Sequence, residues 1–187
     1  MQGQSTRDRI KRAAMQLFVA HGVDAVSMRD IADAVGLKAP SLYAHFKSRD
    51  ALVAGMFQSG YAEYGRRLAE AAATPGPFTR TLAAMVRLIC RLHAEDETLF
   101  NFLLLTQHGN LRDIPIAPEE NPVEVLCGAV ERAMRDGAIS AGDPVLIAAA
   151  LMGVIIQPAT FKLYGRLTGN LAAIQDEIVA LALKVVS

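Results

Sequence analysis

Apolar residues recur every three or four positions along almost the whole chain, and this spacing is typical of amphipathic helices. No segment shows the strict alternation of apolar and polar residues, bounded by hairpin turns, that indicates β-strands. Ser, Asp, Asn and Pro stand where the periodic segments begin, and Gly stands where several of them end. The sequence therefore predicts an all-α protein with about nine helices.

These start and stop signals also predict where each helix lies. Ser5 with Asp8, and Ser27 with Asp30, have the spacing of capping residues at helix N-termini, and Ser48 starts a long helix that breaks at a Pro- and Gly-rich stretch, 74–77. The expected helices span about residues 6–21, 27–36, 38–46, 48–73, 78–93, 96–108, 122–135, 144–167 and 171–186.

Composition excludes several other classes of protein. The chain has 187 residues and is 52% hydrophobic, which is enough for a sizeable core. Its longest aliphatic run covers residues 145–156, whereas a membrane-spanning helix needs about 20 apolar residues. We therefore expect no membrane span, and since residues 1–5 lead directly into charged residues, we expect a cytoplasmic protein. Cys90 and Cys127 lie in apolar helical patterns and are expected to be reduced core residues.

The charges are distributed unevenly, although the formal net charge is zero. Residues 1–60 hold eight Lys and Arg against five Asp, and residues 61–187 hold 11 basic and 14 acidic residues. This distribution predicts a small domain that binds an anion, joined to a larger one that does not.

Residues 27–46 have the spacing of a helix-turn-helix. Ala32 is small enough for two short helices to cross closely, and Gly36, four positions later, tolerates the positive φ of a tight turn. On a helical wheel Leu42 and Phe46 face inward, and small and polar residues occupy the opposite side. Such a face suits a helix that lies in a DNA major groove about 12 Å wide. A helical hairpin that merely packs is the alternative interpretation.

The chain resembles the TetR family of bacterial transcriptional regulators over residues 6–57. The segments that carry the resemblance are L-F-V-A-H-G, S-M-R-D-I-A-D-A-V-G-L and L-Y-A-H-F-K-S-R-D-A-L, which match the DNA-binding domain of that family. Residues 77–187 match the family only in the number and length of helices. The resemblance implies a DNA-binding domain over residues 1–47, a linking helix over 48–74, and an effector-binding and dimerisation domain over 75–187.

The resemblance also implies which residues contact DNA. Ser27 and Arg29 would contact phosphates and base edges, and the segment from Lys38 to Ser41 would read bases. Tyr43, His45 and Arg49 would contact phosphates, with Lys47 alongside; for Tyr43 and His45 the alternative is that they close the edge of the core. The implied DNA-contacting residues are Ser27, Arg29, Lys38, Ala39, Pro40, Ser41, Tyr43, His45, Lys47 and Arg49. Ala44 departs from the family, which often has an aromatic or basic side chain there.

The function expected from this resemblance is that of a homodimeric transcription factor, most simply a repressor, that leaves a palindromic double-stranded operator when it binds a small apolar effector. A DNA-binding dimer without an effector is a second hypothesis. An enzyme is a weaker third, because the sequence shows no nucleophile–base pair, paired acids or phosphate-binding loop. No cofactor is expected.

Large apolar residues in the later helices exceed what one helix face can bury, and a few hydroxyl and amide groups interrupt them. We therefore expect an internal ligand pocket lined by Tyr61, Tyr64, Met85, Phe102, Leu105, Thr106, Met152, Ile156, Gln157 and Phe161. His93 and His108 stand at helix ends, but no Cys or carboxylate is spaced from them as a metal ligand would be, so no metal site is expected.

The segment 145–156 is apolar on all sides, so one face should meet the core of its own subunit and another a second copy of the chain. We expect a dimer that forms through the last two helices, with contacts at Ala148, Ala149, Gly153, Leu171, Ile174, Ile178, Leu181 and Val185.

Overall fold

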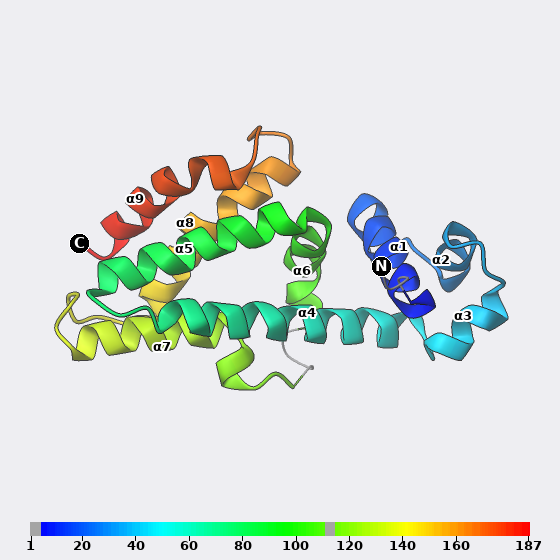
Figure 1. The fold of residues 1–187 in the computed structure, drawn as a ribbon, viewed down its shortest axis with the longest axis horizontal. Helices are drawn as coiled ribbons and strands as arrows, with labels where there is room; N and C mark the ends of the chain where they lie inside the picture. The colour runs from blue at the N-terminus through cyan, green and yellow to red at the C-terminus, as the bar shows by residue number, and fades with distance from the viewer. Residues whose placement is uncertain (1–4, 111–114) are drawn as a thin grey trace. The chain divides into compact units, whose positions relative to one another are not determined.

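The computed structural model describes the backbone of residues 5–110 and 115–187, and the side chains of residues 5–106 and 115–187. All regular structure within these residues is helical, as Figure 1 shows, which confirms the all-α prediction. The elements are α1 (Thr6–His21), α2 (Met28–Ala34), α3 (Ala39–His45), α4 (Arg49–Ala72), α5 (Phe78–Glu95), α6 (Glu97–Asn110), the 3-10 helix η1 (Pro118–Glu120), α7 (Pro122–Arg135), α8 (Pro144–Leu163), the 3-10 helix η2 (Leu171–Ile174) and α9 (Gln175–Val185).

Most helices begin at the residues that the capping signals predicted. The Ser5 hydroxyl accepts a hydrogen bond from the backbone N–H of Asp8, and the Ser48 hydroxyl accepts one from the N–H of Ala51. Asn121 and Asp143 cap α7 and α8 in the same way, each directly before a proline. These bonds satisfy backbone donors that have no partner inside the helix.

The structure corrects two of the predicted helix bounds. α8 ends at Leu163, four residues before the expected end, because Gly165 adopts a φ of 69° and closes a Schellman motif. In that motif the N–H of Gly165 donates to the carbonyl of Lys162, and the N–H of Arg166 donates to the carbonyl of Phe161. The last helix is also shorter than expected, since its first turn is the separate 3-10 helix η2.

The chain folds into two compact units. The first comprises residues Met1–Gly60 and Thr98–Pro115, and the second comprises Tyr61–Glu97 and Ile116–Ser187. In the first unit α6 packs on α1, where the rings of Phe18 and Phe102 stack with centroids 6.1 Å apart. The expected boundaries at residues 47 and 74 separate functional parts and stay a prediction, whereas the two compact units divide inside α4 and α6 joins the first of them.

The core of the second unit forms around α5. One face of this helix is buried against α9, η2 and α8, and α7 packs on α8. Leu82, Met85 and Val86 of α5 are almost fully buried. Cys90 is a buried free thiol and Cys127 is a half-buried one, and burial raises the pKa of both.

In this unit the backbone of η1 approaches α4 closely at Gly65. A Cβ at that position would overlap the carbonyl group of Glu120. Only a residue without a side chain permits this approach.

Helix α8 is the described helix whose length and apolar composition would allow it to cross a membrane. Only one face of it is buried within the unit, through Ala148, Leu151, Ile155 and Ala159. The sequence analysis expected no membrane span because the aliphatic run 145–156 is too short. The whole helix α8 is longer than that run, with 20 residues. Core helices of proteins outside membranes also reach this length and composition, so the feature is weak support for a membrane span.

Candidate nucleic-acid interface

A complete capping box starts α2. The Asp30 backbone N–H donates to the Ser27 hydroxyl at 3.3 Å, and the Asp30 carboxylate accepts from the Ser27 N–H at 2.8 Å. The Ser27 hydroxyl donates to the same carboxylate at 2.7 Å, and these bonds lower the pKa of Asp30. Ser27, which is predicted to contact DNA, is exposed. Its side chain also stabilises the N-terminus of α2.

The turn between α2 and α3 is a Schellman motif. Gly36 has a φ of 69°, its N–H donates to the carbonyl of Asp33 at 3.1 Å, and the N–H of Leu37 donates to the carbonyl of Ala32 at 2.9 Å. Ala32 is buried where the two helices meet. Ala32 and Gly36 thus lie where the sequence predicted. Together they set the orientation of α3 relative to α2.

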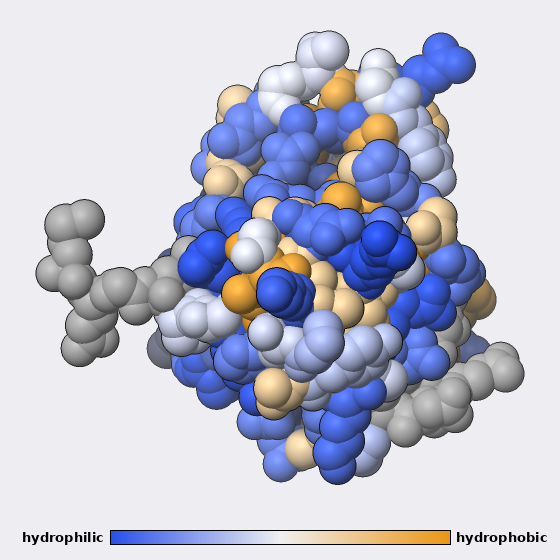
Figure 2. Space-filling model, turned by 90° about the vertical axis from the view of Figure 1, so that its right-hand side faces the viewer, coloured by the Kyte–Doolittle hydropathy of each residue, from blue (hydrophilic) through white to orange (hydrophobic). Residues whose placement is uncertain are grey.

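The outer side of α3 is exposed, and most of the predicted DNA-contacting residues lie on it. Leu42 and Phe46 are buried, whereas Tyr43 remains 53% exposed. The other exposed candidates are Lys38, Pro40, Ser41 and Lys47, and Ala39 and His45 are half-buried. Figure 2 views the surface from the side of α2 and α3, where it is mainly hydrophilic with small apolar patches. Arg29 is exposed on α2.

Arg49 is a second candidate whose side chain makes contacts inside the domain. It donates to the carbonyl oxygens of Val23 and Asp24, each at 3.3 Å. It also forms ion pairs with the carboxylates of Asp24 at 3.8 Å and Asp50 at 3.2 Å. These contacts tie the loop between α1 and α2 to the start of α4.

Two arginines of α1 position the helix-turn-helix, and the sequence reasoning did not single them out. The Arg7 guanidinium lies 4.7 Å from the ring centroid of Phe46, which is a cation–π contact. Arg9 donates to the carbonyl of Val35 at 3.3 Å. No motif marks these residues, because both contacts join positions far apart in the sequence.

Comparison with known families agrees with this geometry. The family described as "Bacterial regulatory proteins, tetR family" matches residues 10–56, which include α2 and α3. Residues 10–56 thus match the N-terminal domain of the TetR family. The predicted helix-turn-helix is therefore confirmed, and the alternative of a hairpin that merely packs is excluded.

Relatives named as transcriptional repressors match a short part of the chain. The HTH-type transcriptional repressor KstR2 of Mycolicibacterium smegmatis is 42% identical over 52 residues, which is 28% of this chain and 25% of that protein. The matched segment thus spans about a quarter of the relative's length.

Solved structures of transcriptional regulators share the fold over nearly the full chain. The ketosteroid transcriptional regulator KstR2 of Mycobacterium tuberculosis has a TM-score of 0.81 at 15% identity and covers 100% of this chain and 97% of its own. The regulator FadR of Bacillus subtilis, in complex with stearoyl-CoA, has a TM-score of 0.74 at 18% identity and covers 96% and 98%. These likenesses show the fold of the second unit.

The residues predicted to line an effector pocket belong to both units. Phe102, Leu105 and Thr106 lie in the first unit and the other candidates lie in the second. Met85 and Phe102 are buried, whereas Leu105 and Phe161 are about half exposed. Burial raises the pKa of Tyr61 to about 12 and raises that of Tyr64 further, so both hydroxyls remain protonated at neutral pH. The pocket stays a prediction.

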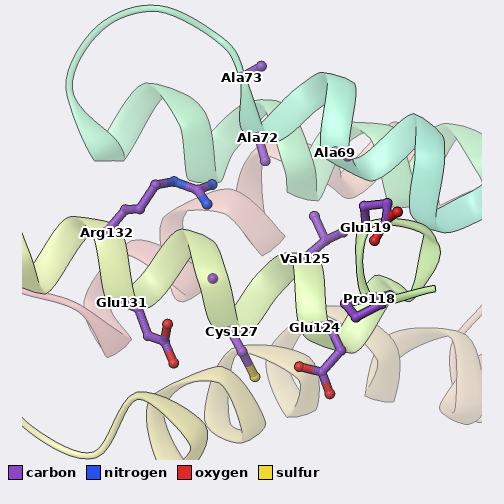
Figure 3. A pocket seen from close by; sticks show the side chains of 11 residues that line it. Ala69, Ala72, Ala73, Pro118, Glu119, Glu124, Val125, Cys127, Glu131 and Arg132 are labelled. Carbon is purple, nitrogen blue, oxygen red and sulfur yellow. The ribbon is translucent and has the colours of Figure 1, made fainter.

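A hollow of about 660 Å³ lies on the second unit between α4 and α7, and Figure 3 shows it from close by. The small side chains of Ala69, Ala72 and Ala73 form its α4 side. Across it, Arg132 of α7 extends toward α4, while Glu124 and Glu131 point away. This hollow shares no lining residue with the predicted effector pocket.

No group of three or more His, Cys, Asp or Glu among the described residues is placed to hold a metal ion. His93 is buried beside Glu97, with its Nε2 3.9 Å from the carboxylate, and Glu97 in turn pairs with Lys162 at 3.1 Å. The side chain of His108 lies outside the described residues. The relatives are transcriptional regulators, and nothing in the described structure indicates catalysis.

The predicted dimer contacts divide between two faces of α8 and α9. Ala148, Leu171 and Ile178 are buried within the unit itself, so they offer little surface to a partner, and the dimer interface stays a prediction. The periodicity did not separate the two faces, because α8 is apolar all round. Ile174 and Val185 are half-buried, and Ala149, Gly153 and Leu181 are exposed. Val145 and Leu146, which are not among the predicted contacts, are 63% and 68% exposed and extend this apolar face.

Proposed function

We propose that this protein is a transcriptional repressor that binds a palindromic operator as a homodimer. The observation that carries the proposal is the exposed, polar outer face of α3 in a domain of the TetR family. Lys38, Ser41 and Arg29 supply the hydrogen-bond donors on this side, and Tyr43 and Lys47 flank them. Such a face reads base edges in the major groove while its flanks bind phosphates.

The apolar surface of α8 and α9 supports dimerisation. Val145, Leu146 and Leu181 are all more than half exposed, and apolar side chains at this density on two adjacent helices favour burial against a partner. Ala149 and Gly153 are small, so two copies of α8 can approach closely. A two-fold dimer carries two recognition helices, which fit successive major grooves when they are about 34–36 Å apart.

We infer further that a small, mainly apolar effector releases the protein from DNA. The fold relatives include a regulator in complex with stearoyl-CoA and a ketosteroid regulator, which suggests an acyl or steroid-like compound as the effector class. Such a molecule needs to bind one conformation of the second unit better than another in order to shift the operator affinity. A dimer without effector is the second candidate function, and it predicts that no such compound changes operator binding.

Selection of bound fragments from random double-stranded DNA tests the DNA-binding proposal. A palindromic consensus is expected, and its two half-sites should be related by the two-fold axis of the dimer. Lys38→Ala should relax the base preference within each half-site, whereas Lys47→Ala should weaken binding to all sequences about equally. Arg135→Ala, an exposed change on α7, is the matched control. Failure of the wild-type protein to enrich any sequence would contradict the proposal.

A further inference from the structure

We propose that a basic hollow on the second unit binds an anion that carries two linked phosphate groups. The hollow has a volume of about 510 Å³ and lies between α4 and α5. Its walls are one face of α5 and the last turns of α4 with Thr74, which follows that helix. They are formed by Arg67, Glu70, Ala71 and Thr74 on one side and by Ala84, Arg87, Leu88 and Arg91 on the other. Each set has the i, i+3, i+4, i+7 spacing that brings side chains to one face.

Two of the three guanidinium groups have carboxylate partners. Arg67 donates to both carboxylate oxygens of Glu95, at 2.7 and 3.0 Å, and Arg87 donates to Asp176 at 2.9 and 3.1 Å. The acid of the hollow, Glu70, is paired with Arg66 at 2.8 Å.

Arg91 differs from the other two arginines. It is exposed, and among the described residues no carboxylate lies within ion-pair distance of it. Arg91 and Arg87 are one helical turn apart on α5, so their side chains leave the helix in the same direction. Arg91 is thus available to bind an anion. Arg67 and Arg87 can donate to the same anion through the N–H groups that their carboxylate partners leave unused.

The chemistry of these groups selects phosphate among the common anions. A guanidinium is planar, stays charged, and presents up to five N–H donors in a fork that matches phosphate oxygens. Arg87 uses Nε and Nη2 for Asp176, which leaves the donors of Nη1. Arginines from two helices line the hollow, so an anion with two linked phosphate groups can accept N–H donors from both sides. Ala71 and Ala84, both half-buried, provide a small apolar surface for the remainder of a phosphorylated molecule.

Occupation of the hollow would affect two ion pairs that join different helices. The Arg67–Glu95 pair connects α4 with α5, and the Arg87–Asp176 pair connects α5 with α9. A phosphate competes with both carboxylates for the same donors. If the proposed function holds, α4 continues into the unit with the recognition helix and α9 carries part of the dimer surface. The anion would then change operator affinity as well.

Isothermal titration with inorganic pyrophosphate, at constant ionic strength held with chloride, tests the site directly. The wild-type protein should bind one pyrophosphate per chain, and Arg91→Ala should weaken binding about tenfold. Asp176→Asn should instead tighten binding about threefold, because it releases Arg87 from its carboxylate partner. All of these positions are exposed or half-buried, so the fold should tolerate the changes.

Two controls locate the binding. Arg135→Ala removes an exposed arginine of the second unit outside the hollow, and Lys47→Ala removes a cation of the DNA-binding face. Both should leave the pyrophosphate affinity unchanged. No binding by the wild-type protein, or equal losses in Arg91→Ala and Arg135→Ala, would show that the arginines form only an interhelical ion-pair network, and the site would be refuted.

Operator binding, measured with and without pyrophosphate, separates this site from the proposed function. Pyrophosphate binding with the expected pattern of variants supports the site even if the protein binds no operator. An operator affinity that responds to pyrophosphate in the wild-type protein, and not in Arg91→Ala, supports the regulatory consequence. An affinity that changes equally in both proteins would refute that consequence.

Discussion

The side chain of Arg49 donates to two backbone carbonyls of the loop between α1 and α2 and lies beside two carboxylates. A guanidinium held in this way is partly neutralised, and its donors are turned into the domain. Lys47 is exposed two residues earlier, with no such partner in the described structure. The two basic residues at the end of the helix-turn-helix therefore differ in role, since Arg49 positions a loop and Lys47 faces solvent.

We predict that Arg49→Met lowers the free energy of unfolding by about 1 kcal/mol, because it leaves carbonyl groups without their donor. Its operator affinity should fall without a change in the salt dependence. Lys47→Met should have the opposite profile, with unchanged stability and a slope of log K against log salt that is smaller by about 1. Thermal unfolding and fluorescence anisotropy over a range of salt measure the two quantities. A reduced salt slope in Arg49→Met would restore this residue as a phosphate contact.

His93 supplies a prediction for pH. Burial lowers the pKa of this imidazole below its ordinary value of 6.5, and Lys162 adds to the effect while Glu97 opposes it. The unfolded chain therefore takes up the proton first as the pH falls through 6.5, which favours unfolding. The stability that neutral His93 contributes is present above this pH and is lost progressively below it.

His93→Gln should consequently reduce the loss of thermal stability between about pH 7 and pH 5, even if it lowers stability at both. His21→Gln, at an exposed position, is the matched control and should keep the wild-type slope. Thermal midpoints in a series of buffers give the slopes. Identical slopes for wild type and His93→Gln would mean that other groups govern the acid response.

Helix α4 contains two glycines with opposite surroundings. At Gly65 a Cβ would overlap the backbone of Glu120, whereas at Gly55 nothing lies within 4 Å of the same atom. Gly65→Ala should therefore push η1 away from α4 and destabilise the protein by about 1–3 kcal/mol. Gly55→Ala should stabilise it by about 0.5–1 kcal/mol, because alanine loses less conformational entropy in a helix. Chemical denaturation of both variants decides between these signs, and equal effects would contradict the close approach at Gly65.

Most of the helices were predictable because their ends depend on neighbours in the sequence. Ser27 with Asp30 and the glycine at position 36 act within a few residues, so the helix-turn-helix followed from local chemistry. The contacts of α6 were not predictable, because the stacking of Phe18 on Phe102 joins residues far apart in the chain. The buried face of α8 was not predictable either, since a helix that is apolar on all sides has no periodic pattern that indicates which side is buried.

If the whole protein is a dimer, substitutions in its interface should reduce the mass of the particle in solution to that of one chain. Ala149 and Leu181 are exposed on the apolar face of α8 and α9, so glutamates at both positions would place charges in a buried seam without entering the core of the unit. Ala149→Glu with Leu181→Glu should yield folded monomers that have lost most of their operator affinity. Sedimentation velocity measures the mass, and circular dichroism verifies the helical content.

Ala94→Glu serves as the control, because it adds a charge at an exposed position of α5. This variant should sediment as the wild-type protein does. A wild-type protein that is monomeric at micromolar concentration, or a double variant that remains dimeric, would place the interface elsewhere.

The first unit is built from two stretches of chain that are separated by residues 61–97. During synthesis α1 leaves the ribosome long before α6 exists, and Phe18 has no ring to stack on until Phe102 has been added. By then more than half of the 187-residue chain has been translated. A fragment that stops at residue 60 would likewise leave the α6-facing side of α1 in water. The first unit, although it begins the sequence, therefore cannot complete its core until α6 has been translated.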